Sequence, residues 1–111
     1  MTSSAKAFTV ELNDQPEFQR LLPGEPQTHG MKSGRVYLEP GKSCGQHSTK
    51  GNEELLVFLA GQGLVHIGDA DQLAVSAGKV AYIPPQTLHD VENTGSQALA
   101  YIYCVASAGL E

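Results

Sequence analysis

The chain has 111 residues and a formal net charge of −5, from 12 acidic and 7 basic side chains. A chain of this length forms a single domain. Its lysines and arginines are scattered, which excludes the clustered positive charge of a nucleic-acid binder or of a protein recruited to an anionic membrane. No apolar run reaches signal-peptide length or the roughly 20 residues of a membrane span. We therefore expect a cytoplasmic protein in which Cys44 and Cys104 are reduced.

The first predicted element is the only helix candidate. Residues 14–22 begin with Asp14 as a candidate N-cap and end before Pro23 and Gly24, which predicts a helix of about two turns. From Met31 onward, short apolar or alternating runs are separated by turn residues. The predicted strands cover residues 35–39, 55–60, 64–67, 73–75, 80–83, 89–92 and 99–105. Short strands at this spacing predict an all-β sandwich or barrel.

The same pattern divides the chain into three parts. Residues 1–34 are expected to form an N-terminal arm with the short helix and an edge strand. Within this arm, residues 8–12 alternate between apolar and polar side chains, as in a strand. Residues 35–105 are expected to form a barrel, and residues 106–111 a tail.

Two stretches place a histidine beside turn residues at the edge of a strand. Residues 41–61 include His47 and Glu54, and residues 78–93 include His89. Neutral imidazole and carboxylate ligands together suit Fe, Mn, Ni, Zn or Cu. Neither stretch has the close ligand pairing of a zinc finger or of the HExxH helix. Any metal site must therefore be assembled in space from both stretches.

These stretches resemble the paired motifs of the cupins, single-domain jelly-roll barrels (double-stranded β-helices) that commonly bind one metal in the lumen. The first motif is Gly, five residues, His-x-His, three or four residues, Glu, six residues, Gly; its matches here are Gly41, His47, Glu54 and Gly61. The second is Gly, five residues, Pro-x-Gly, two residues, His, three residues, Asn; its matches are Gly78, Pro84, His89 and Asn93. The resemblance covers about residues 35–105.

The sequence departs from the family pattern at two positions. Thr49 stands where the first motif has its second histidine, and Gln86 replaces the inner glycine of the second motif. The resemblance therefore implies one divalent transition metal bound by His47, Glu54 and His89, with the fourth position empty or filled by Thr49 or water. Two histidines and a carboxylate form the ligand set of non-haem Fe(II) oxygenases. The alternative is a lumen that no longer binds metal.

Neighbouring residues allow two interpretations each. Glu53 also satisfies the permitted spacing, but the six-residue step to Gly61 favours Glu54, and the two carboxylates of an extended segment point in opposite directions. Candidates to line the pocket near the metal and orient a substrate, or simply to pack the barrel, are Cys44, Thr49, Tyr82, Tyr101 and Tyr103. The other two histidines are expected to be structural or solvated: His66 and His29.

The resemblance implies a metal-dependent oxidoreductase or dioxygenase that acts on a small organic molecule. One alternative is a cupin that binds a small molecule without catalysis. Another is a cupin-type isomerase, although a sugar-phosphate site should contain clustered Arg and Lys, and this chain has only two arginines. Small cupins are often homodimers in which an N-terminal segment adds a strand to the partner's sheet, and residues 8–12 alternate as such a strand would.

Overall fold

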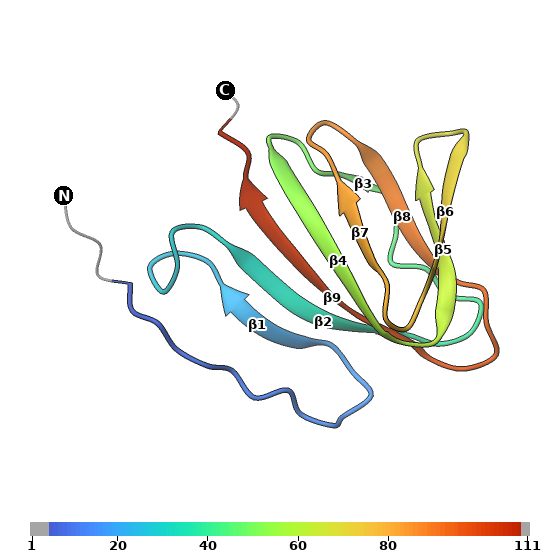
Figure 1. Ribbon diagram of the computed structural model, residues 1–111, viewed down its shortest axis with the longest axis horizontal. Helices are drawn as coiled ribbons and strands as arrows, with labels where there is room; N and C mark the ends of the chain where they lie inside the picture. The colour runs from blue at the N-terminus through green and yellow to red at the C-terminus, as the bar shows by residue number, and fades with distance from the viewer. Residues whose placement is uncertain (1–4, 110–111) are drawn as a thin grey trace.

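The computed structural model describes residues 5–109 as two antiparallel β-sheets that pack against each other (Figure 1). The five-stranded sheet contains, in spatial order, β1 (Gln19–Pro23), β2 (Lys32–Leu38), β9 (Leu99–Ser107), β4 (Asn52–Ala60) and β7 (Val80–Ile83). The four-stranded sheet contains β3 (His47–Ser48), β8 (Leu88–Asn93), β5 (Gln62–Ile67) and β6 (Asp71–Ser76). The predicted all-β fold class is confirmed.

Every strand predicted after residue 34 is present, but the predicted helix is wrong. Residues 19–23 form β1, whose pairing with β2 places Gln19 opposite Arg35. The local preference for helix is weak, and the pairing overrides it because β1 forms a ladder of hydrogen bonds with β2. No helix among residues 5–109 is long and apolar enough to cross a membrane.

Two boundaries between the predicted parts of the chain also differ from those in the structure. β2 begins at Lys32 and β1 lies entirely within the predicted arm, so the arm contributes to the five-stranded sheet. β9 continues to Ser107 and so includes the start of the predicted tail, whose residues 110 and 111 lie outside the described part of the chain.

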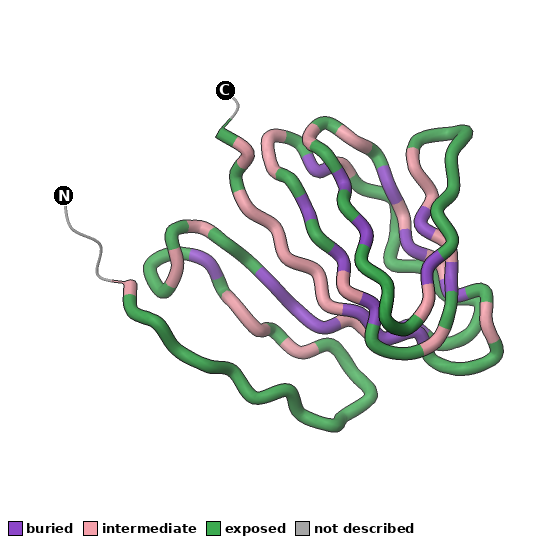
Figure 2. The backbone as a smooth tube through the Cα atoms, in the orientation of Figure 1, coloured by how far each residue is buried: buried purple, intermediate pink, exposed green. Residues whose placement is uncertain are grey.

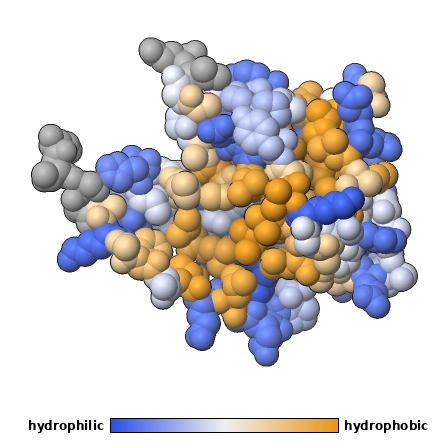
Figure 3. All heavy atoms as spheres, viewed as in Figure 1, coloured by the Kyte–Doolittle hydropathy of each residue, from blue (hydrophilic) through white to orange (hydrophobic). Residues whose placement is uncertain are grey.

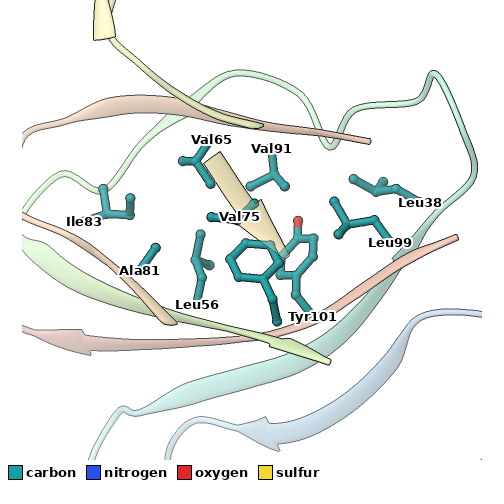
Figure 4. Close-up of a cluster of buried hydrophobic side chains, with 10 residues drawn as sticks. Leu38, Leu56, Val65, Val75, Ala81, Ile83, Val91, Leu99 and Tyr101 are labelled. Carbon is teal, nitrogen blue, oxygen red and sulfur yellow. The ribbon is translucent and has the colours of Figure 1, made fainter. Parts of the chain in front are cut away.

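The core forms where the inner faces of the two sheets meet. In β4, Glu54, Leu56 and Phe58 are buried, because successive residues of a strand point to opposite faces. Figure 2 shows buried positions alternating with more exposed ones along the strands. Figure 4 shows core side chains from both sheets pointing toward one another, with Leu38 and Leu99 at one end of the cluster. Each fully buried aliphatic or aromatic side chain contributes about 1.5–3 kcal/mol.

The predicted barrel corners include one position that only glycine can occupy. Gly61 has a φ of 84°, and a Cβ there would lie 2.4 Å from the carbonyl oxygen of Ala98. Gln86 has a φ of 56°, so the turn before β8 keeps the left-handed conformation although glycine is absent. Its backbone N–H donates to the Lys50 carbonyl at 2.7 Å, which holds a conformation that costs about 1–2 kcal/mol for a non-glycine residue.

Candidate metal centre

Three side chains predicted as metal ligands meet between the two sheets. His47 on β3 and His89 on β8 are direct cross-strand partners, and their ring centroids lie 4.2 Å apart. Glu54 reaches them from β4 of the facing sheet. One ligand atom from each residue lies within 4.8 Å of the others. The two motifs therefore converge on one point although 35 residues separate Glu54 from His89 in the sequence.

Backbone carbonyls orient both imidazole rings. His89 Nδ1 lies 3.1 Å from the Thr87 carbonyl, and His47 Nδ1 lies 2.9 Å from the Gly45 carbonyl. A carbonyl can only accept a hydrogen bond, so these contacts assign the proton of each neutral ring to Nδ1. Both Nε2 atoms are then left with a lone pair. This arrangement is typical of metal-binding histidines, in which the outer nitrogen donates to a carbonyl or carboxylate.

The Nε2 atom of His89 tests whether the residues fit a cation. His89 is 1% exposed, and its Nε2 lies 2.8 Å from Glu54 Oε1. Among the described residues, however, this nitrogen has no hydrogen bond of acceptable geometry. Native structures rarely leave a buried polar atom without a partner, and an ion is one accepted explanation. A divalent metal between the lone pair and the carboxylate would satisfy both groups, so the residues fit a metal.

The charge of the site also favours a cation. Burial alone would lower the pKa of His89, but the adjacent Glu54 carboxylate, together with the Thr87 carbonyl, outweighs it and raises the pKa. The 6% exposed Glu54 thus attracts positive charge to the imidazole. A proton or a metal ion can provide that charge.

Glu53 and Tyr82 lie outside this centre. Glu53 points to the outer face of β4, where its carboxylate accepts a hydrogen bond of 2.8 Å from the Tyr82 hydroxyl and raises the pKa of that tyrosine. The prediction that Tyr82 lines the cavity is wrong. Tyr82 pairs directly with Leu55, so it shares the outer face with that residue and is 56% exposed.

Thr49 links the first motif to the turn before His89. The residue is 5% exposed. Its hydroxyl donates to the Pro84 carbonyl at 2.7 Å and accepts from the Thr87 backbone N–H at 3.1 Å. Because the Thr87 carbonyl in turn orients His89, Thr49 fixes the turn that positions one imidazole. The residue that replaces a family histidine therefore has a structural role in this chain.

The centre lies at one side of a cavity of about 380 Å³. The cavity wall shares Leu56, Val91 and Tyr101 with the hydrophobic core, which fills the space behind it. Tyr103, a candidate for the cavity wall from the sequence, also lines the cavity. No expectation came from the sequence for the remaining polar wall residues, which face inward from β2 or lie beside the first motif: Lys32, Ser48 and Asn52.

Cys44 and Tyr101 provide neutral donors at the cavity wall. The Cys44 thiol lies 3.4 Å from Asp90 Oδ1 and accepts from the Val91 backbone N–H at 3.4 Å. Burial raises the pKa of the thiol and, more strongly, that of the Tyr101 hydroxyl. Both groups therefore keep their protons at neutral pH. His66, by contrast, bonds to Glu92 at 2.8 Å outside the cavity, as expected of a structural histidine.

Comparison with known proteins agrees with this geometry. Residues 34–105 match the Cupin domain family. The chain belongs to the cupin family. This cupin is 34% identical over 68 residues to an oxalate-binding protein of Thermotoga maritima, an alignment that covers 61% of this chain and 55% of the relative. The chain thus spans about half the length of the curated relatives it matches.

Solved structures show the same fold. A Cupin 2 conserved barrel domain protein from Salinispora arenicola has a TM-score of 0.74 and 22% identity, covering 93% of this cupin and 92% of that chain. A predicted oxalate decarboxylase from Thermotoga maritima has a TM-score of 0.68 and 21% identity, covering 89% of this cupin and 99% of that chain. At these identities the likeness establishes the double-stranded β-helix fold.

Proposed function

We propose that this cupin binds one divalent transition metal (Fe, Mn, Ni, Zn or Cu) through His47, Glu54 and His89. The observation that supports it is the convergence of two carbonyl-oriented imidazoles and one buried carboxylate within 4.8 Å. Nitrogen and oxygen donors of this kind suit first-row transition metals. When bound, the metal supplies Lewis acidity and a template for a small molecule.

The ligand that we propose for this centre is a small organic acid held in the cavity. A relative at 34% identity is named an oxalate-binding protein. Lys32 is the cationic side chain among the lining residues, and Glu54 is the carboxylate among them. With a divalent metal at Glu54, the cavity has a net positive charge that favours an anion. Neither a nucleic acid nor a membrane matches the net charge of −5.

The activity that we propose is metal-dependent oxidation or dioxygenation of this molecule. Three protein ligands leave coordination positions free for a substrate and dioxygen. The chain's own contribution is positional: Cys44 and Tyr101 offer neutral donors that orient the substrate, while apolar wall residues exclude water. An isomerase of sugar phosphates receives less support, because neither Arg20 nor Arg35 lines the cavity.

The deciding experiment is metal analysis of protein purified without added metal and then reconstituted with Fe(II), Mn(II) or Ni(II). We expect about one equivalent in the wild type and little in His47→Ala and His89→Ala. The matched control is His66→Ala, which removes a histidine outside the cavity and should retain the metal. Equal metal content in all four proteins would refute the centre.

Oxygen uptake with small organic acids, diketones, thiols and catechols then separates catalysis from binding. Catalysis predicts substrate-dependent uptake that His89→Ala abolishes. Metal-dependent thermal stabilisation by oxalate without any oxygen uptake would instead support the non-catalytic alternative, a cupin that only binds its ligand.

A further inference from the structure

Lys32 shares one row of the five-stranded sheet with a residue of the metal centre. Lys32 on β2 pairs with Val105 on β9, and Val105 pairs on its other side with Glu54 on β4. Side chains of directly paired residues lie on the same face of a sheet, and all three residues line the cavity. The row therefore ends in a carboxylate on one side of the cavity and in an ammonium on the other.

The strand order keeps these two charges apart. Neighbouring strands lie about 4.8 Å apart, so two strand spacings place the Cα atoms of Lys32 and Glu54 roughly 10 Å apart. The stem of Lys32 lies against Gly24, which follows β1: a Cβ on Gly24 would lie 3.2 Å from its Cε and 3.4 Å from its Cγ. Because β1 is on the opposite side of β2 from β9 and β4, this contact holds the lysine stem away from Glu54.

The wall between the two charged residues is apolar or aromatic. Val105 lies in the row itself, and Tyr103 lies in the next row. Gly34 makes room for the tyrosine, because a Cβ there would lie 2.8 Å from Cε2 of the Tyr103 ring. On its other side, this ring stacks with Phe18 at a centroid distance of 6.5 Å. This part of the wall is therefore suited to contact with hydrocarbon.

The ammonium of Lys32 has no anionic partner in the part of the chain that the structure describes. It takes part in no ion pair there and in no side-chain hydrogen bond. In Figure 3, hydrophobic residues gather across the middle of the view, over the strands of the five-stranded sheet, and hydrophilic residues lie mainly at the margins. A lysine that lines a cavity of this sheet departs from that distribution, and its charge is available to a bound anion.

The charges of the cavity favour a dianion. Lys32 and Glu54 are the lysine and the carboxylate among the lining residues. A divalent metal at Glu54 leaves an excess of positive charge, which is divided between the metal centre and the ammonium. A ligand with one negative group at each end neutralises both sites, whereas a monoanion neutralises one.

We propose that Lys32 determines substrate specificity, and that the substrate class is a dicarboxylic acid whose carboxylates are joined by a hydrocarbon spacer. One carboxylate lies at the metal centre, the other accepts hydrogen bonds from the Lys32 ammonium, and the spacer packs on Val105 and Tyr103. Oxalate cannot reach both ends, because its two carboxyl carbons are bonded directly to each other. The inference rests on the metal centre and on the small-acid ligand proposed above.

The test is isothermal titration calorimetry of the Zn(II)-reconstituted protein with glutarate, pentanoate and oxalate. Glutarate and pentanoate have chains of equal length and differ by the second carboxylate. Lys32→Met removes the ammonium and keeps an unbranched stem, so it should weaken glutarate binding at least about fivefold. The same variant should change the dissociation constants of pentanoate and oxalate by less than about twofold.

Two control variants accompany Lys32→Met. Lys79→Met removes an exposed lysine that does not line the cavity, and Lys32→Arg keeps the positive charge. Both should retain the affinity for glutarate within about twofold. A zinc-loaded wild type that binds no glutarate overturns the inference. So do equal losses for glutarate and pentanoate in Lys32→Met, or the same loss of glutarate affinity in Lys32→Arg.

The zinc content of each protein separates this inference from the proposed function. Lys32→Met should hold as much zinc as the wild type, and loss of zinc from it would overturn a role confined to the substrate. A wild type that holds no zinc refutes the metal centre and this inference together. A wild type that holds zinc but whose glutarate affinity does not depend on Lys32 refutes this inference alone.

Discussion

Replacing Thr49 with valine removes a hydroxyl while retaining a branched side chain of similar size. The hydroxyl satisfies the Pro84 carbonyl and the Thr87 backbone N–H in a place where Thr49 is 5% exposed. Leaving a buried polar group unsatisfied costs about 1–3 kcal/mol. With two groups affected, we expect the free energy of unfolding to fall by about 2–6 kcal/mol. For a domain near 100 residues, the melting temperature should then fall by at least about 8 °C.

The assay is urea denaturation of the metal-free protein, with unfolding monitored by far-ultraviolet circular dichroism. Thr49→Ser keeps the hydroxyl and should recover most of the loss. Thr94→Val changes an exposed threonine and should alter the free energy by less than about 0.5 kcal/mol. In the same variants, metal affinity should fall by about 10- to 100-fold only for Thr49→Val, because Thr87 orients His89.

The result that would refute this reasoning is a Thr49→Val protein whose metal-free form is as stable as the wild type. If such a protein also lost its metal, Thr49 would be acting as a ligand. The structural role derived from its two hydrogen bonds would then be wrong.

Three further predictions concern the ligands and one barrel corner. Glu54→Gln should weaken metal binding by at least about tenfold in a competition assay with a chelator, whereas Glu53→Gln should leave it unchanged, because only Glu54 faces the histidines. Gly61→Ala should lower the free energy of unfolding by more than about 2 kcal/mol in urea, because its new Cβ would meet the Ala98 carbonyl; a smaller loss would show that the corner can relax. In the metal-free protein, the raised pKa of His89 adds stability that is fully present below its unfolded pKa of about 6.5 and is lost as the pH rises through the higher folded pKa. The stability advantage of the wild type over His89→Gln should therefore shrink as the pH rises above about 6.5, and an advantage that grows with pH would contradict this sign.

The sequence predicted the strands and the three converging side chains because both depend on spacing. Gly61 could be predicted to be a barrel corner from its place in the family motif, and its φ of 84° is a conformation that favours glycine. Glu54 could be separated from Glu53 by its distance from that corner. Both inferences need only the local chain and the family motif.

The sequence could not predict which face each strand turns inward when no motif fixes it. Tyr82 is a candidate for the cavity wall from the sequence, but the register that pairs it with Leu55 places it on the outer face. Lys32 lines the cavity because β2 pairs with β9, and this pairing leaves no local signal. The helix predicted for residues 14–22 failed for the same reason, because strand β1 exists only through its pairing with β2.

The unequal exposure of the three ligand side chains has a kinetic consequence. Glu54 and His89 are buried, whereas His47 is exposed, and the hydrophobic core occupies the space behind the cavity. A metal and a small molecule bound at this centre would therefore both enter from the side of His47. A small molecule held there would block the exit of the metal, so its residence time would set the rate at which a chelator extracts the metal.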